Sequence, residues 1–140
     1  MNINDLMKNT NSTNYFMLDV GAHLDRLEPG HAEVSLVTEN RHKNLNGMMH
    51  GGALLTLIDS AAGAASRSFG GTLVTLECKT NFIKGVKVEG QKVTAVADVI
   101  HNGRTIKVLD VKIYNRDVLS CTASVTMFAT SQEPRFEPVD

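Results

Sequence analysis

The chain has 140 residues, of which 42% are hydrophobic and 21% are charged, and its formal net charge at pH 7 is −1. These values fit one globular domain with a real core, and they exclude the basic surface by which proteins bind nucleic acid or an anionic membrane. The chain starts without the pattern of a secretory signal, and its most apolar stretch, residues 53–65, is too short to cross a bilayer. We therefore expect a cytoplasmic protein with neither nucleic-acid nor membrane partners.

The first elements are an arm and a hairpin. Residues 1–17 are polar and rich in asparagine and threonine, with a weak helical start near residues 3–7, so we expect a loosely attached N-terminal arm. Alternating apolar residues follow around 20–24 and 32–36, and Pro29-Gly30 separates the two runs. Because Pro-Gly is a strong turn signal, this pattern predicts a β-hairpin.

A long helix is predicted after a loop without periodicity over residues 38–49. From Ala53 onward, apolar residues recur at spacings of three and four, namely Leu54, Leu57, Ile58, Ala61, Ala62 and Ala65. This is one apolar stripe of an α-helix. At about 100° per residue, Asp59 lies about 140° from Leu54. We therefore expect its carboxylate to face a cleft or a second subunit rather than the sheet.

Four strand-like segments follow the helix, over residues 73–83, 91–100, 105–114 and 118–129. Asn102-Gly103 predicts a tight hairpin between the second and the third of them. A phase slip near Leu109-Asp110 predicts a β-bulge. One helix can cover one face of the resulting six-stranded antiparallel sheet, and the uncovered face and edge favour an oligomer.

Two further features complete the chain. Cys78 and Cys121 alternate in phase with apolar neighbours, so we expect buried, unreactive thiols without a disulfide. Residues 131–140 contain two prolines and predict a flexible C-terminal tail.

The segment from Asn44 to Asp59 carries the candidate chemistry. It sets His50-Gly51-Gly52 directly before the helical run and one carboxylate inside that run. The N–H groups at the start of a helix attract an oxygen with negative charge, and a carboxylate on an apolar helix is costly without a partner or a function. Together these groups point to a site where a carbonyl is polarised and attacked.

Each residue of this segment also has a structural interpretation. Asp59 alone fits a carboxylate that pairs with a lysine or caps a neighbouring loop, His50 alone fits a helix-entry turn, and Asn44 alone fits a loop cap. The spacing of His42 and His50 crosses a loop with no third ligand nearby, which argues against a metal site.

The order of the elements and this motif resemble the hotdog-fold acyl-CoA thioesterases, in particular the PaaI-like group. The pattern of that group is H-x-N-x-x-G-x-x-H-G-G, followed by Asp nine residues after the second His. It is matched here by His42, Asn44, Gly47, His50, Gly51, Gly52 and Asp59. Gly103-Arg104-Thr105 resembles a further G-R-T stretch of the family. The resemblance implies an α+β hotdog fold, with a curved antiparallel sheet of about six strands wrapped around one long central helix.

This resemblance covers residues 18–130 and implies a homodimer, often paired into a tetramer, with active sites at the dimer interface. It implies an enzyme that hydrolyses a small aryl- or fatty acyl-CoA thioester to the free acid and coenzyme A, without a metal or organic cofactor. The division of the chain would be an arm over 1–17, a thioesterase domain over 18–130 and a tail over 131–140.

Residue roles are carried over from the family by position. Asp59 would act as general base or nucleophile, and the Gly51 backbone amide would polarise the carbonyl. His50 and Asn44 would position the thioester and the water, and Thr75 would orient the attacking water. Contacts with the substrate and its coenzyme A part are expected from Gly52, Asn81, Phe82, Arg104 and Thr105.

Two other functions remain open on the sequence. One is an acyl-thioester hydratase or dehydratase of the same fold. The other is a non-catalytic acyl-CoA-binding sensor, although the chain lacks the length and the charge for an attached DNA-binding domain.

Overall fold

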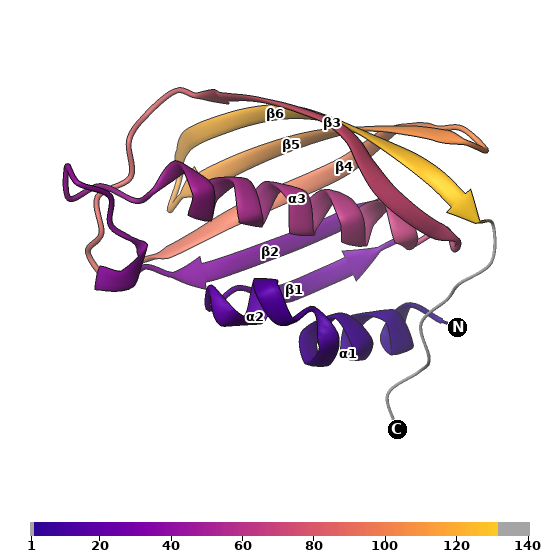
Figure 1. Ribbon diagram of the computed structural model, residues 1–140, viewed down its shortest axis with the longest axis horizontal. Helices are drawn as coiled ribbons and strands as arrows, with labels where there is room; N and C mark the ends of the chain where they lie inside the picture. The colour runs from indigo at the N-terminus through magenta and orange to yellow at the C-terminus, as the bar shows by residue number, and fades with distance from the viewer. Residues whose placement is uncertain (1, 132–140) are drawn as a thin grey trace.

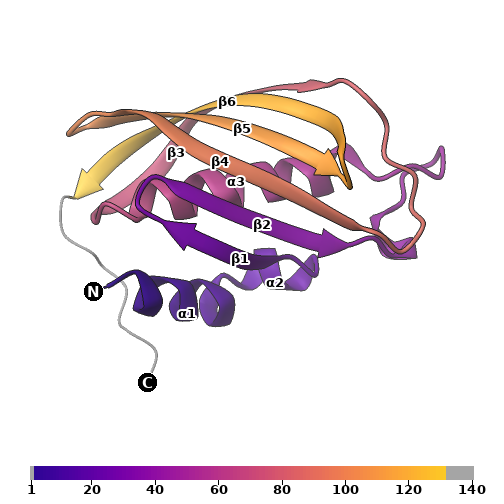
Figure 2. The same cartoon turned by 180° about the vertical axis from the view of Figure 1, so that it is seen from behind.

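The computed structural model describes residues 2–131. Within that range, six antiparallel strands form one sheet in the order β1-β2-β4-β5-β6-β3. The strands are β1 (His23–Glu28), β2 (His31–Val37), β3 (Thr72–Phe82), β4 (Lys92–Asn102), β5 (Ile106–Asn115) and β6 (Val118–Ser131). The sheet curves around the helix α3 (Gly51–Arg67), as Figures 1 and 2 show from opposite sides. The predicted architecture and the hairpin before the helix are confirmed.

Helix α3 has the amphipathic pattern that the sequence predicts. The residues of the apolar stripe are all buried, with Leu57 and Ile58 completely inaccessible. Burying each of these two side chains contributes about 1.5–3 kcal/mol, so the stripe fixes which face of the helix meets the sheet. The helix ends at Arg67, and positive φ angles at Gly70 and Gly71 turn the chain back into β3.

The predicted bulge in β5 is wrong. Lys107, Leu109, Val111 and Ile113 share the buried face of β5 without a break. The lysine fits there because its long side chain extends to the strand end, where the ammonium bonds the side chain of Asn102. The register shifts occur on the neighbouring strands instead: opposite Leu109 in β4, and opposite Ile113 in β6.

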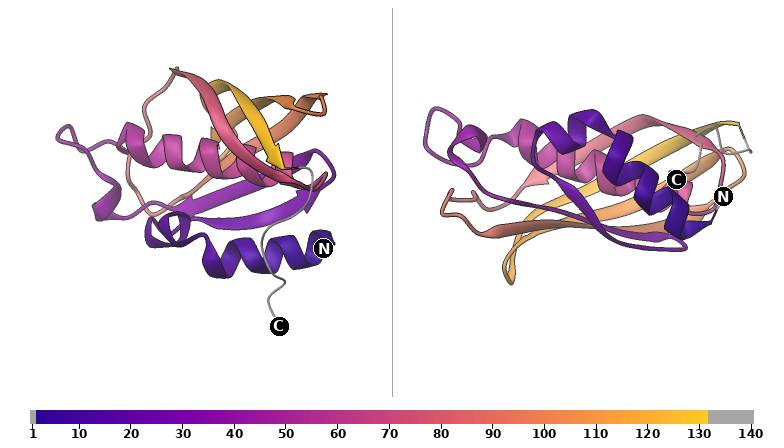
Figure 3. Two further views of the ribbon diagram at one scale, coloured as in Figure 1. Left: turned by 45° about the vertical axis from the view of Figure 1, so that its right-hand side comes forward. Right: turned by 90° about the horizontal axis from the view of Figure 1, so that it is seen from below.

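The N-terminal segment differs from the expected loose arm. It forms α1 (Ile3–Thr13) and α2 (Tyr15–Asp19), which lie along β1 in Figures 1 and 3. Leu6 and Met17 are buried against the core, and the Asn11 side chain exchanges hydrogen bonds of 2.8 and 2.9 Å with the backbone of Leu24. Asn11 therefore satisfies the outer edge of β1 at Leu24. Residues 132–140 of the predicted tail lie outside the described range, and the boundaries of arm, domain and tail remain predictions.

The two cysteines are free, Cys121 buried and Cys78 half-buried. Burial raises the pKa of the Cys121 thiol to about 11. Since the thiolate is the reactive species, we expect a thiol reagent near pH 8 to label Cys121 only when the protein unfolds, and to label Cys78 first. Labelling followed by peptide mass spectrometry measures this order, and equal rates for the two thiols in the folded protein would contradict it.

No helix among residues 2–131 combines the length and the apolar character that crossing a bilayer demands.

Candidate active site

The loop before α3 is held by His42, a buried residue of the short 3-10 helix η1 (Asn40–His42). Its Nδ1 accepts a hydrogen bond of 2.9 Å from the Glu39 backbone, so the proton is on Nε2, which donates to the Val20 carbonyl at 2.6 Å. The backbone carbonyl of His42 accepts a bond of 2.7 Å from the N–H of His50. His42 therefore holds the loop that leads into α3.

Asn44 closes this loop with its side chain. Its Oδ1 accepts hydrogen bonds of 2.8 Å from the Asn46 N–H and 3.1 Å from the Met48 N–H. Gly47 adopts φ +76°, which favours a residue without a side chain at that point of the turn. The loop-capping interpretation of Asn44 accounts for its oxygen, and direct contact with a thioester stays a prediction.

Helix α3 begins with an unused amide. His50 is the N-cap, and its Nδ1 accepts a bond of 2.7 Å from the Gly52 N–H. The Gly51 N–H, one position earlier, has no hydrogen-bond partner within residues 2–131. A Cβ built on Gly51 would lie 3.6 Å from the ring of Phe82, so this amide is next to an aromatic side chain from the end of β3. A free N–H at the positive end of a helix dipole suits an oxygen that gains negative charge.

Asp59 faces a cavity, as its position on the helix predicts. The carboxylate is exposed, and its Oδ1 accepts a hydrogen bond of 2.6 Å from the Thr75 hydroxyl of β3. The same hydroxyl oxygen lies 3.5 Å from the Met127 sulfur, but its single proton goes to the nearer and charged acceptor. Asp59 has no ion pair within the described residues, so the structural alternative of a lysine partner is wrong there.

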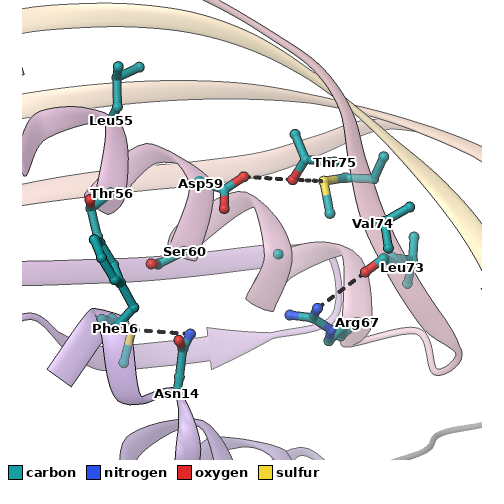
Figure 4. A pocket seen from close by; sticks show the side chains of 13 residues that line it. Asn14, Phe16, Leu55, Thr56, Asp59, Ser60, Arg67, Leu73, Val74 and Thr75 are labelled. Atoms are coloured by element: carbon teal, nitrogen blue, oxygen red, sulfur yellow. Dashed lines mark hydrogen bonds between the residues drawn. The ribbon is translucent and has the colours of Figure 1, made fainter. Parts of the chain in front are cut away.

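The cavity next to Asp59 has a volume of about 570 Å³. Figure 4 shows Asp59, Ser60 and Arg67 along one side of α3, with Thr75 on β3 above and Phe16 and Asn14 from the N-terminal segment opposite. The remaining lining residues are Met17, Leu55, Thr56, Gly63, Leu73, Val74 and Met127. This volume is in the usual range for small-molecule pockets.

A second cavity, of about 340 Å³, lies at the start of α3 and includes His50, Gly52 and Arg41. It shares Phe16 and Thr56 with the cavity of Asp59, so the two hollows adjoin. Helix α2 thus lines both cavities, which the sequence did not predict. The only signal was the apolar pair Phe16-Met17 at the end of an otherwise polar segment.

Within one chain, the Gly51 amide and the Asp59 carboxylate lie too far apart to act on the same carbonyl group. Eight residues of α-helix separate them, a rise of about 12 Å. The N–H groups of a helix also point toward its N-terminus, here away from Asp59. The amide and the carboxylate of a single chain therefore cannot meet across one small carbonyl group.

The predicted coenzyme A contacts divide between the two ends of the sheet. Asn81 and Phe82 end β3 beside the start of α3. Arg104 and Thr105 lie in the turn between β4 and β5, at the other end of the molecule in Figure 1, and line neither cavity. Their role as ligand contacts stays a prediction.

Within residues 2–131 no three His, Cys, Asp or Glu side chains are grouped so that they could hold a metal ion.

Comparison with known proteins places the chain in a family. The family model described as the thioesterase superfamily matches residues 46–122. Acyl-coenzyme A thioesterase PaaI of Escherichia coli is 30% identical over 97 residues, which are 69% of each chain. Its structure superposes with a TM-score of 0.87 over 96% of this chain and 100% of that chain, at 22% identity. The chain therefore belongs to the thioesterase superfamily.

Two other solved structures agree with this assignment. A conserved protein from Pseudomonas aeruginosa is 37% identical, with a TM-score of 0.77 over 81% of this chain and 92% of its own. A hypothetical thioesterase from Streptococcus pneumoniae, solved with coenzyme A, is 34% identical, with a TM-score of 0.75 over 80% and 90%. The protein is a PaaI-like hotdog thioesterase, that is, a thioester hydrolase.

Proposed function

We propose that this protein hydrolyses acyl-CoA thioesters, with Asp59 as general base or nucleophile and the Gly51 amide as the donor to the thioester carbonyl. The observation that carries this proposal is the Asp59 carboxylate, which is oriented by Thr75 and opens into a cavity large enough for an acyl group. The acyl-CoA activity named for the Escherichia coli relative and the coenzyme A in the Streptococcus pneumoniae structure support the choice of thioester.

Two copies of the chain complete each site in this proposal. Asn11 bonds the outer edge of β1 at Leu24, whereas the outer edge of β3 has no strand partner within residues 2–131. On β3, Val74 and Leu76 remain 49% and 63% exposed. An exposed apolar edge strand favours aggregation, and pairing of β3 with a second copy would cover this edge. Two-fold pairing through β3 would set the α3 helices antiparallel, with the start of one beside the middle of the other. The Gly51 amide of one copy then reaches the Asp59 of its partner.

The chemistry needs only groups that these residues supply. The amide draws electron density toward the carbonyl oxygen, and one such donor typically raises the rate about 10²–10³-fold. Asp59, as base, takes a proton from a water while that water's oxygen attacks the carbonyl carbon. General base catalysis of this kind typically raises the rate about 10²–10⁴-fold. The C–S bond then breaks, and coenzyme A leaves as a thiolate. Because a thiol has a pKa near 8.5, it departs without an acid, so we propose a reaction that needs no metal or organic cofactor.

A thiol-release assay tests the proposal directly. Purified protein is given acetyl-, hexanoyl-, palmitoyl-, benzoyl- and phenylacetyl-CoA, and release of free coenzyme A is expected from at least one class. Hydration of crotonyl-CoA, followed by loss of the conjugated double bond, would instead indicate a hydratase. Tight binding of every ester without release of coenzyme A would indicate a sensor, and either result would overturn the proposal.

Thr75 provides a graded test of how Asp59 is held. Thr75→Val keeps the shape of the side chain but removes the hydroxyl that donates to Asp59. Since a hydrogen bond to a charged group is worth about 1.5–3 kcal/mol, we expect kcat to fall about 10- to 100-fold with little change in KM. Thr75→Ser retains the hydroxyl and should recover most of the rate. Equal losses in the Val and Ser variants would show that the hydroxyl does not position Asp59.

A further inference from the structure

Arg67 extends into the cavity of Asp59 from the last turn of α3. A Cβ built on Gly63 would lie 3.0 Å from its Nη1, so the guanidinium leans back over Gly63, one turn nearer to Asp59. Helical side chains point toward the N-terminus, and the missing side chain of Gly63 gives this one room. Figure 4 shows the guanidinium facing the hollow between α3 and the N-terminal segment.

The hydrogen-bonding capacity of Arg67 is mostly unused. Its Nη2 donates to the Leu73 carbonyl at 3.2 Å, and within residues 2–131 it makes no other hydrogen bond and no ion pair. A guanidinium carries five N–H donors, and a half-buried cation without a counter-ion is costly. Burial lowers the pKa of Arg67, and the charge of Asp59 opposes that shift. The cavity is thus lined both by a cation with free donors and by the Asp59 carboxylate.

A carboxylate is the group that matches this arrangement. It accepts two parallel hydrogen bonds from a guanidinium, the strongest pairing available to arginine. Four helical residues separate Asp59 from Gly63, a rise of about 6 Å, so a short carbon chain would span from a carbonyl at Asp59 to the guanidinium. Without Arg67, Asp59 would repel such a second carboxylate.

We propose that Arg67 selects acyl groups that end in a carboxylate, so that the preferred substrates are the mono-CoA thioesters of short dicarboxylic acids. This inference rests on the proposed function and adds the class of acyl group to it. Asn14 and Ser60, which line the same cavity, provide polar neighbours for the second carboxylate.

The test compares two esters of equal chain length that differ in their far end. Glutaryl-CoA carries a carboxylate there and pentanoyl-CoA a methyl group, and wild-type protein should show the higher kcat/KM for glutaryl-CoA. Arg67→Met should lower kcat/KM for glutaryl-CoA about 10- to 100-fold more than for pentanoyl-CoA. Arg26→Met is the matched control, because Arg26 is exposed on β1 and pairs with Glu28, away from both cavities.

Several outcomes would overturn the inference. A wild-type preference for pentanoyl-CoA would do so, and so would equal losses for both esters in Arg67→Met. If the Met variant does not fold, Arg67→Lys keeps the charge without the two-pronged geometry, and it too must lose more on glutaryl-CoA than on pentanoyl-CoA.

Failure of the proposed function has a different signature, because wild-type protein would then release no coenzyme A from either ester. In that case the inference is tested by calorimetry, which measures the affinity for each ester. Wild-type protein should bind glutaryl-CoA more tightly than pentanoyl-CoA, and Arg67→Met should remove the difference. Equal affinities of the wild-type protein for the two esters would contradict the role of Arg67.

Discussion

Asp59→Asn is expected to lower kcat for acyl-CoA hydrolysis by about 10²–10⁴-fold while the protein folds as before. Asparagine has the shape of aspartate, and its carbonyl oxygen can still accept the hydrogen bond from Thr75. It cannot take a proton from water or attack a carbonyl as an anion. Because Asp59 is exposed in its cavity, the substitution leaves the core untouched. Release of coenzyme A at saturating substrate measures the loss.

Asp110→Asn is the matched control for this substitution. Asp110 is an exposed carboxylate on β5 and lines neither cavity. Its variant should keep the wild-type rate, and both variants should show the wild-type thermal transition. If the Asp59→Asn variant were as fast as Asp110→Asn, the Asp59 carboxylate would have no role in the reaction.

Gly51→Pro should lower kcat about 10²–10³-fold, because proline lacks the backbone N–H that we propose as the donor to the thioester carbonyl. The helix itself tolerates the change. Gly51 is the first residue of α3, the position at which proline is most accepted, and His50 before it already has φ −63° and ψ 136°, which a following proline requires. The added Cβ meets only an ordinary contact of 3.6 Å with Phe82.

Gly51→Ala separates the effect of the missing N–H from that of the added Cβ. It introduces the same Cβ but keeps the donor, so its rate should stay near that of the wild type. Far-ultraviolet circular dichroism should give the same helix content for both variants. If alanine and proline slow the enzyme equally, the loss is steric, and the Gly51 amide is not the group that polarises the carbonyl.

Most of the fold could be predicted because its signals are local. The apolar stripe of α3 and the turn at Pro29-Gly30 each follow from spacing or from one dipeptide. The bulge in β5 was predicted wrongly because Lys107 occupies a position on the buried face of the strand. A charged residue at such a position interrupts the alternation of apolar and polar residues in the sequence. Of the two N-terminal helices, the sequence indicated only a weak helical start near residues 3–7, because their stability comes from long-range packing of Leu6 and Met17 against the core.

The candidate site was predictable in composition but not in geometry. The motif predicted roles for Asp59 and Gly51, which stay predictions, and the angle along the helix predicted that Asp59 faces a cleft, where the structure has it lining a cavity. The sequence offered a loop cap for Asn44 but could not decide between it and contact with a thioester, because the hydrogen bonds of its oxygen depend on the turn at Gly47. Nor did it identify Arg67, whose position matters only after β3 folds back over the end of α3.

Subunit complementation tests most directly whether two copies share each site. Asp59→Asn and Gly51→Pro chains are co-expressed with different tags, and the mixed dimers are isolated and assayed for release of coenzyme A. If the amide and the carboxylate come from different copies, one of the two sites in each mixed dimer has both native groups, and activity returns to about half of the wild-type value. Mixed dimers as inactive as the two parent variants would contradict the account.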